Sequence, residues 1–201
     1  MSASEKLLDN QGLQSIPIEK EPQLYQLSVE QYIQMIEMGL FHPELKTELI
    51  EGRLYRKGGI PERHAYCVNR LVSLLFRELT NDEFDISVQN PIRLQNSRPE
   101  PDLVIQTKAS WEAGGDPKAE DISLVIEVAH SSLTFDREIK LPIYAKNGIK
   151  NYWIVNLESN QLEVYGLPSD GTYNEKKVYK PGEKTSLPGM DKEIAVSDFL
   201  S

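Results

Sequence analysis

Two apolar segments constrain the fold of this chain more than any other feature. Residues 103–105 (Leu-Val-Ile) follow a proline and an aspartate, and residues 121–128 (DISLVIEV) are apolar almost throughout. Short apolar runs bounded by turn residues are typical of buried strands, and a nearly continuous run suits a strand covered on both faces. The chain is therefore expected to build around a central sheet.

Three segments have the apolar spacing of helices. Residues 28–40 open with Ser and Gln at the spacing of a capping box and continue with an apolar stripe. Residues 61–79 repeat apolar side chains at helical intervals after an initial proline, and a third helix is predicted to begin near Thr134 and to stop at Gly148. These helices are expected to cover the sheet.

The remaining pattern predicts further strands, with a loop over residues 108–120. Strands are expected over residues 47–56 (with a bend or bulge at Gly52), 84–94, 150–156, 161–167 and 173–180, before a terminal turn or short helix. The order of elements predicts the α/β class, bordering on α+β, with a central mixed sheet flanked by helices. Residues 27–201 are predicted to form one domain, preceded by a flexible arm over residues 1–26.

Composition narrows the function classes. The chain has 31 acidic and 22 basic residues among 201, a net charge of −9, which argues against a broad, non-specific grip on nucleic acid without excluding a local basic groove. No apolar run reaches membrane-spanning length, no signal-peptide layout opens the chain, and Cys67 has no second cysteine to pair with. A cytoplasmic location without membrane partners is expected, with Cys67 a packed thiol.

Two carboxylates stand where the strand pattern does not require them. Asp102 opens the first apolar strand and Glu127 interrupts the second. Because buried carboxylates repel each other unless they are paired or bound to a cation, adjacent strands carrying them predict a site for Mg²⁺ or Mn²⁺. Lys140, on the following helix, is placed to direct its ammonium group at the same point.

The motifs around these residues carry a resemblance. The segments TELIEGRLY, PEPDLVI, LVIEVAHSS, DREIKLPIYAKNGIKNYWIVN and QLEVY resemble, in this order, the Uma2 family of the PD-(D/E)XK restriction-endonuclease-like superfamily, over about residues 28–170. The resemblance implies the restriction-endonuclease-like fold. The chain departs from the family at His130 and Ser131, where a Ser-Pro pair is more usual, and the departure changes a turn but no proposed ligand.

The resemblance also implies roles for individual residues. It makes Asp102 and Glu127 metal ligands and Glu48 a third acid at the site. In the superfamily a lysine often lies two residues after the second acid, a position held here by Ala129. The family instead uses the lysine of the following helix, which matches Lys140.

Three points stay open from the residues alone. Glu48 and Glu51 lie on opposite faces of the predicted strand, so periodicity does not choose between them and only the resemblance favours Glu48. His64, in the first turn of the second helix, is interpreted as a surface or capping residue rather than a phosphate contact. Asp136 and Arg137 are interpreted as an exposed helix start.

The leading functional hypothesis is a Mg²⁺- or Mn²⁺-dependent endonuclease that hydrolyses DNA. Metal bound by Asp102, Glu127 and Glu48 would activate a water molecule. Lys140 would orient or deprotonate that water and neutralise the negative charge that develops in the reaction. The alternatives are a catalytically inactive nuclease-fold dimer and a metal hydrolase acting on small phosphoesters. A homodimer is expected, because an edge hairpin over residues 151–167 would expose apolar side chains and because the resembled family forms homodimers.

Overall fold

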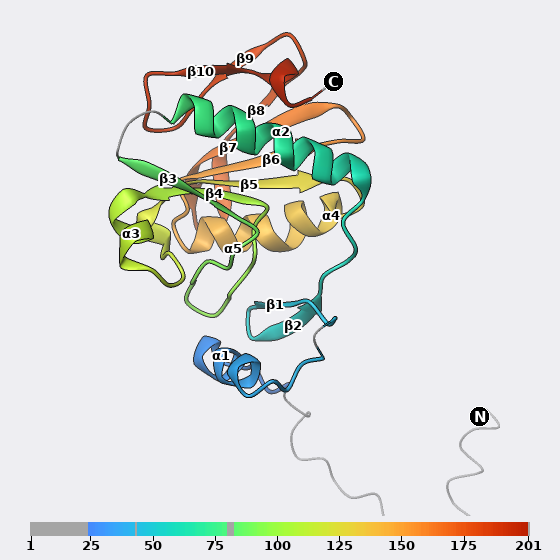
Figure 1. The fold of residues 1–201 in the computed structure, drawn as a ribbon, viewed down its shortest axis with the longest axis vertical. Helices are drawn as coiled ribbons and strands as arrows, with labels where there is room; N and C mark the ends of the chain where they lie inside the picture. Colours follow the sequence, from blue (N-terminus) through green and yellow to red (C-terminus); the bar gives the residue numbers. More distant parts are fainter. Residues whose placement is uncertain (1–23, 43, 80–82, 201) are drawn as a thin grey trace, which may run out of the picture.

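The computed structural model describes residues 24–42, 44–79 and 83–200, and its centre is a six-stranded sheet (Figure 1). The strands lie in the order β3-β4-β5-β6-β7-β8, and only β5 and β6 run parallel to each other. Their bounds are β3 (Phe84–Val88), β4 (Leu103–Thr107), β5 (Ile122–Ala129), β6 (Asn151–Asn156), β7 (Gln161–Ser169) and β8 (Thr172–Tyr179). The predicted central mixed sheet is confirmed.

One face of the sheet is covered by α2 (Glu62–Glu78). Leu71 and Leu75 of this helix are fully buried in a cluster with Ile105 and Trp153 of the sheet. The cluster also receives the chain end, where β9 (Lys184–Ser186), β10 (Glu193–Ala195) and η3 (Val196–Asp198) pack beside α2. The pair β9–β10 was not expected from the sequence, since each strand has only three residues.

The opposite face is covered by a single helical segment after β5. It consists of α4 (Leu133–Phe135), the π-helical turn η2 (Asp136–Lys140) and α5 (Leu141–Lys146). Tyr144 packs against Tyr152 of β6 with the ring centroids 4.9 Å apart, in a second apolar cluster on this face. The predicted helix is therefore present, and Gly148 follows its end with a positive φ of 80°.

The segment over residues 47–56 is a hairpin, so the prediction of one bent strand was wrong. β1 (Thr47–Ile50) and β2 (Arg53–Arg56) pair in antiparallel register through a two-residue turn at Glu51 and Gly52. Both turn residues have positive φ, 45° and 73°, the combination that a tight hairpin turn requires. The alternation of the flanking residues gave no sign that the chain reverses direction here. Glu51 gave none either, because a glutamate rarely adopts a positive φ.

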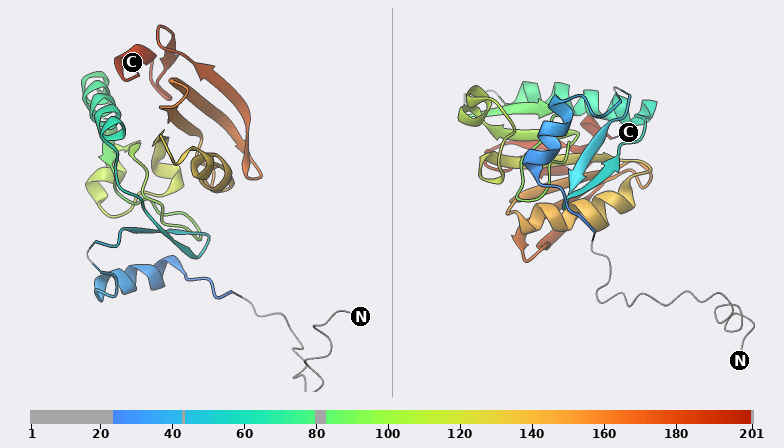
Figure 2. Two further views of the ribbon diagram at one scale, coloured as in Figure 1. Left: turned by 90° about the vertical axis from the view of Figure 1, so that its right-hand side faces the viewer. Right: turned by 90° about the horizontal axis from the view of Figure 1, so that it is seen from below.

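Helix α1 (Val29–Glu37) packs on this hairpin at one end of the molecule (Figure 2). The predicted capping box is present, with Ser28 and Gln31 bonded to each other's backbone N–H groups. The buried Tyr32 hydroxyl donates a 2.7 Å hydrogen bond to the carbonyl of Thr47. The predicted arm over residues 1–26 lies largely outside the described residues.

Two other predictions differ from the structure. The segment 108–120, expected as a loop, contains α3 (Lys108–Ala113) and the 3₁₀ turn η1 (Ala119–Asp121). The strand expected over residues 84–94 ends at Val88, after which Gln89 turns the chain with a φ of 50°. In the described part of the chain, no helix is both long and apolar enough to cross a membrane.

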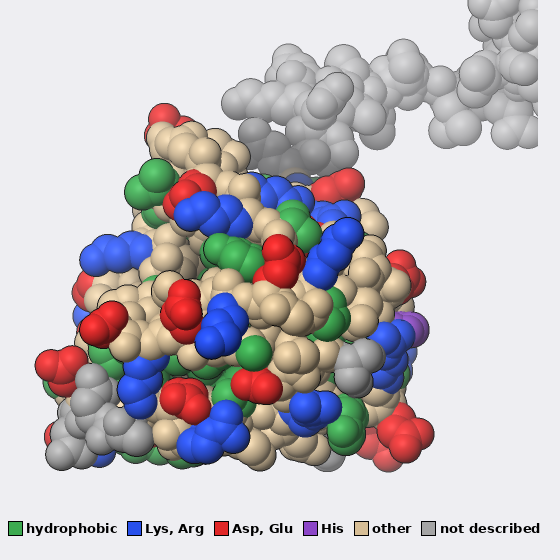
Figure 3. Space-filling model, turned by 90° about the horizontal axis from the view of Figure 1, so that it is seen from above, with side chains coloured by type: hydrophobic (Ala, Val, Ile, Leu, Met, Phe, Trp, Pro, Cys, Tyr) green, Lys and Arg blue, Asp and Glu red, His purple; other side chains and the backbone are tan. Residues whose placement is uncertain are grey.

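The expected edge hairpin is not at an edge. β6 lies between β5 and β7, and its Tyr152 and Trp153 are fully buried, while β3 and β8 form the edges of the six-stranded sheet. The aromatic residues that suggested an interface therefore belong to the core. Figure 3, the molecule seen from above, shows basic and acidic side chains interspersed across the visible face, without a continuous basic stripe.

Candidate active site

A cavity of about 770 Å³ lies where β4 begins and β5 ends. Its walls come from the β1–β2 hairpin, the segment leading into α2, the turn after β3 and the helical segment after β5. All four residues predicted for the site line it, namely Glu48, Asp102, Glu127 and Lys140. The structure thus brings together side chains that are as much as 92 residues apart in the sequence (140 − 48).

The register of two antiparallel strands brings Asp102 and Glu127 to this cavity. Leu103 of β4 lies opposite Ile126 of β5. Asp102 directly precedes Leu103 and Glu127 directly follows Ile126, so the two acids lie side by side at the same end of the strand pair. This register confirms the prediction that the two acids lie next to each other at the ends of neighbouring strands.

Asp102 is held in place by three groups. Its Oδ2 accepts hydrogen bonds from the backbone N–H of Val128 at 2.8 Å and pairs with Nε2 of His64 at 3.0 Å, while Oδ1 lies 3.4 Å from Nε2 of Gln89. Partial burial alone would raise the pKa of Asp102, but the hydrogen bond and charge of His64, with the Val128 N–H, lower it overall. Asp102 is therefore ionised at neutral pH.

Glu127 lies deeper and is only 4% exposed. Its Oε1 accepts hydrogen bonds from Nζ of Lys140 and from the hydroxyl of Tyr144, both at 2.9 Å. Burial raises the pKa of Glu127 to about 8, although the adjacent ammonium group opposes the shift. A cation close to this carboxyl group would favour its ionised form.

Lys140 is the buried cation of the cavity. Its Nζ lies 2.9 Å from Glu127 Oε1, 3.6 Å from Glu48 Oε2 and 4.0 Å from Asp136 Oδ1. Burial by itself would lower the pKa of Lys140, but these three carboxyl groups reverse the effect and raise it. The side chain is thus an ammonium group at neutral pH, and the predicted direction of Lys140 is confirmed by its contacts.

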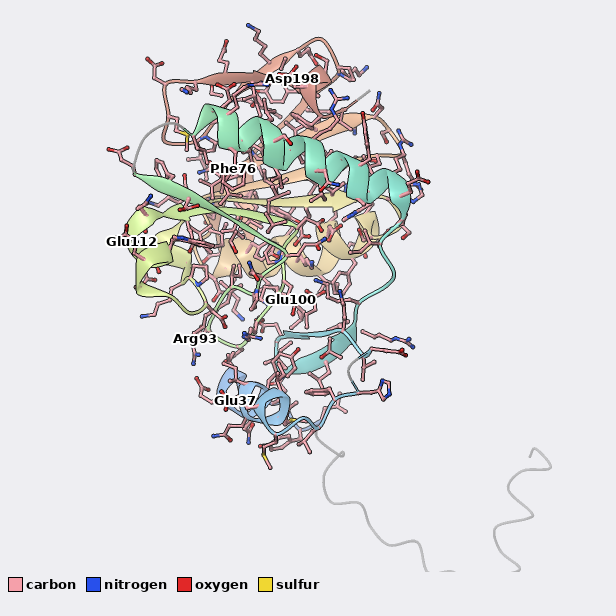
Figure 4. The ribbon with its side chains drawn as sticks, in the orientation of Figure 1. Glu37, Phe76, Arg93, Glu100, Glu112 and Asp198 are labelled. Carbon is pink, nitrogen blue, oxygen red and sulfur yellow. The ribbon has the colours of Figure 1, made fainter. Side chains whose placement is uncertain are left out.

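Glu48 and Glu51 occupy different places. Glu48 is 4% exposed, lines the cavity and accepts a 3.2 Å hydrogen bond from the backbone N–H of Glu100. Figure 4 shows Glu100 between the β1–β2 hairpin and the sheet. Glu51 lies in the hairpin turn, 3.3 Å from Nζ of Lys146 and outside the cavity lining. The geometry therefore places Glu48, and not Glu51, with the other acids.

Asp136 is a fourth acid at the cavity, so its interpretation as part of an exposed helix start was wrong. It is only 2% exposed and accepts a 2.7 Å hydrogen bond from the hydroxyl of Ser132. It lies at the start of the π-helical turn, where the N–H of Leu141 bonds to the carbonyl of Asp136, five residues back. Arg137, next in the chain, pairs instead with the buried Glu163 of β7.

The interpretation of His64 as a surface or capping residue was also wrong. Its ring faces Asp102, and its Nδ1 is buried without a hydrogen-bond partner among the described residues. The sequence did carry a signal, because His64 lies four residues before Val68 and seven before Leu71, on the buried stripe of α2. Gln89 and Tyr144 were missed, and only the spacing of Tyr144, four residues after Lys140, pointed toward the site.

The donor set fits a hard divalent cation. Asp102 and Glu127 offer carboxylate oxygens in one cavity, and Mg²⁺ commonly binds through one or two carboxylates and completes its shell with water and phosphate oxygens. Within the described ranges, no group of three or more His, Cys, Asp or Glu side chains is arranged to hold a metal ion. The chemistry of the two acids therefore suits the ion, and the place of Glu48 as a third ligand stays a prediction.

The fold of this chain is shared with a protein of known structure. The structure resembles a crystal structure described as a "putative nuclease belonging to DUF820" from Anabaena variabilis ATCC 29413, with a TM-score of 0.69 and 16% sequence identity over 86% of this chain and 97% of that one. At this identity the likeness shows a shared fold.

The sequence places the chain more narrowly. The Uma2 family, described as "putative restriction endonuclease", matches residues 29–197, which is most of the chain, so the protein belongs to the Uma2 family. The resemblance inferred from the motifs is thereby confirmed. A comparison with functionally curated proteins found no match.

Proposed function

We propose that this protein is a Mg²⁺- or Mn²⁺-dependent endonuclease that hydrolyses phosphodiester bonds of DNA. The observation that supports this most is the convergence of Asp102, Glu127 and Lys140 in one cavity, within a chain of the Uma2 family. Two acids from neighbouring strands with a buried lysine form a suitable site for phosphoryl chemistry.

In this proposal Asp102 and Glu127 hold the ion, and Glu48 is the third acid. A bound divalent cation supplies Lewis-acid polarisation of a phosphate oxygen and lowers the pKa of a water molecule. His64, Gln89 and the Val128 N–H fix the orientation of Asp102 through the contacts described above.

Lys140 contributes positive charge to the cavity in this proposal. Three surrounding carboxyl groups raise its pKa, so in the absence of a bound cation the side chain is an ammonium group at neutral pH. It donates a hydrogen bond to Glu127 and provides positive charge near the position of a phosphate in the cavity. In this proposal Lys140 orients the attacking water and neutralises the negative charge that develops on the phosphate.

The mouth of the cavity offers positive charge despite the net charge of −9. Lys46, Arg56 and Lys57 line it together, and the backbone N–H of Lys57 bonds to the carbonyl of Lys46 at 2.9 Å. Lys57 is tied to Glu100 by a 3.0 Å ion pair, whereas Lys46 and Arg56 are exposed and make no ion pair within the described part of the chain. These two cations support phosphate binding at the rim.

The test is cleavage of supercoiled plasmid and linear duplex with Mg²⁺, with Mn²⁺ and with EDTA. We expect metal-dependent nicking by the wild type and a loss of about 100-fold or more in Asp102→Ala and Glu127→Gln. Glu51→Gln is the matched control, because this glutamate lies outside the cavity, and it should cleave as the wild type does. Equal cleavage by Asp102→Ala, or cleavage that persists in EDTA, would contradict the proposal.

A further inference from the structure

The cavity is larger than the proposed metal site requires. Its volume is about 770 Å³, whereas a divalent cation with six oxygen ligands of the size of water needs roughly 180 Å³. Glu48, Glu127 and Lys140 line the most buried part of the cavity, and each of them is at most 5% exposed. The remaining space can therefore hold a second and larger part of a substrate.

Uncharged residues line a more exposed part of the same cavity. Tyr55 and Phe135 are half-buried, and Ile60 is 50% exposed. Gly58 and Gly59 lie beside them in the lining, and an added Cβ at either glycine would meet open space. Aromatic and apolar walls with a few polar groups are typical of pockets that bind organic ligands. This part of the cavity therefore suits a flat, partly apolar group better than a second ion.

The two aromatic rings lie directly beside the acids. Tyr55 is opposite Glu48 in the register of the β1–β2 hairpin, so both side chains point to one face of it. The Tyr55 ring packs on Phe135 of α4, with the ring centroids 5.2 Å apart and the planes inclined by 57°. The centroid of the Phe135 ring in turn lies 5.9 Å from Nζ of Lys140, which bonds to Glu127. A substrate held by the acids therefore reaches the rings without leaving the cavity.

Polar groups without a protein partner line the same space. The Tyr55 hydroxyl and the ring nitrogens of His130 form no hydrogen bond with the residues that the structure describes, and both side chains belong to the cavity lining. They are free to bond to the edge of a bound group. A nucleobase combines a flat apolar face with hydrogen-bonding edges, and a single sugar joins it to its phosphate.

We infer that this part of the cavity binds the nucleobase next to the cleaved phosphate, so that the base leaves its helix before cleavage. The inference rests on the proposed nuclease function and specifies its substrate as DNA with an unpaired base. The base stacks against the pair of Tyr55 and Phe135. A base inside a duplex is covered on both faces by its neighbours, so it has to unpair to reach the rings, and unpairing is easiest at a mismatch or a bulge.

The test is fluorescence anisotropy with three labelled DNA duplexes, in EDTA and in Ca²⁺. One duplex is fully paired, one carries a single bulged thymidine, and one carries the same bulge as an abasic nucleotide. We expect the thymidine bulge to bind about 5- to 150-fold more tightly than the abasic bulge, the effect of one stacked base. Tyr55→Ala should remove this difference, because its affinity falls for the thymidine bulge and stays unchanged for the abasic bulge.

Three further variants serve as controls. Tyr55→Phe keeps the ring and should keep the preference for the thymidine bulge. Tyr55→Leu keeps an apolar side chain without a flat ring and should lose the preference, which preserves the test if Tyr55→Ala does not fold. Phe76, labelled in Figure 4, is 59% exposed and lies outside the cavity lining, so Phe76→Ala should bind all three duplexes as the wild type does.

The outcomes separate this inference from the nuclease function, because binding is measured apart from cleavage. Equal wild-type affinity for the two bulges, a preference that persists in Tyr55→Leu, or no binding of the thymidine bulge in either condition would overturn it, even if plasmid is cleaved. A loss in Tyr55→Leu that is equal for the two bulges would also overturn it and would assign the ring to packing alone. A base-dependent preference that Tyr55→Leu removes would support the inference even if no cleavage is found.

Discussion

Binding of a divalent cation at the proposed site should release a proton from Glu127. Burial raises the pKa of this carboxyl group to about 8, so at pH 7 most of the metal-free molecules carry it in the protonated form. A cation coordinated by the carboxylate requires the ionised form, and the proton then leaves to solvent. The expected release is therefore a large part of one proton per ion at pH 7, and it becomes smaller as the pH rises through about 8.

Isothermal titration calorimetry with Mg²⁺ or Mn²⁺ measures this release. Titrations in buffers of different ionisation enthalpy give the number of protons from the slope of observed heat against buffer heat. Glu127→Gln removes the titrating group and should bring the release near zero, while Glu51→Gln should behave as the wild type. The reasoning is refuted if wild type and Glu127→Gln release the same number of protons, or if wild type binds the ion and releases none.

The same pKa fixes the sign of the pH dependence of stability in the absence of metal. The folded protein keeps the Glu127 proton up to about pH 8, whereas the unfolded chain loses it near the ordinary value of 4.5. The contribution to stability is therefore fully present below about pH 4.5 and is lost as pH rises through about 8. Chemical denaturation should show a slope of at most about 1.4 kcal/mol per pH unit between these values, and the slope should be flatter in Glu127→Gln.

Three further predictions concern the fold and its assembly. Gly52→Ala should lower the free energy of unfolding by about 1–3 kcal/mol in urea titrations. Gly52 has a φ of 73°, and an added Cβ would lie 2.6 Å from a neighbouring side-chain carbon. Gly58→Ala is the control, because the space around Gly58 is open and the stability should change little. Burial alone would raise the pKa of Glu163, but hydrogen bonds from an arginine, a tyrosine and a lysine lower it to about 2, so its stabilisation is present above about pH 4.5 and lost as pH falls through 2. Glu163→Gln should therefore lower the free energy of unfolding by roughly 1–2 kcal/mol at pH 7, which thermal melting would show as a lower Tm. The decrease should be much smaller at pH 2–3, and the exposed Glu175→Gln is the control. The homodimer also remains a prediction, and a monomer mass in light scattering at micromolar concentration would contradict it.

The elements that the sequence predicted correctly are those whose residues face one dominant environment. The strand over residues 122–129 is buried on both faces, and its apolar run indicated this directly. Helix α2 has one buried stripe, and its period was equally clear. The two acids could be assigned to the site because a carboxylate within such a run conflicts with its surroundings, and the conflict is itself the signal.

The elements that were missed depend on backbone conformation that the side-chain pattern does not express. The hairpin turn uses Glu51 at positive φ, where a glycine or asparagine would have been the recognisable residue. The burial of Asp136 depends on the π-helical turn, since an α-helical period of 3.6 residues gives no indication of the wider turn. Such turns occur often at functional sites, where the wider spacing redirects a side chain.

The position of the lysine follows from the packing of the face that carries Glu127. Ala129 lies two residues after Glu127 and therefore points to the same face of β5. It is fully buried in the apolar cluster that contains Ile143 and Tyr144, so a lysine at this position would have to displace the helical segment that covers the face. Lys140 comes from that covering segment, and its ammonium group lies 2.9 Å from the Glu127 carboxylate. The small side chain at position 129 allows the helix to pack closely on the strand, and this close packing is what brings the lysine within hydrogen-bonding distance of the acid.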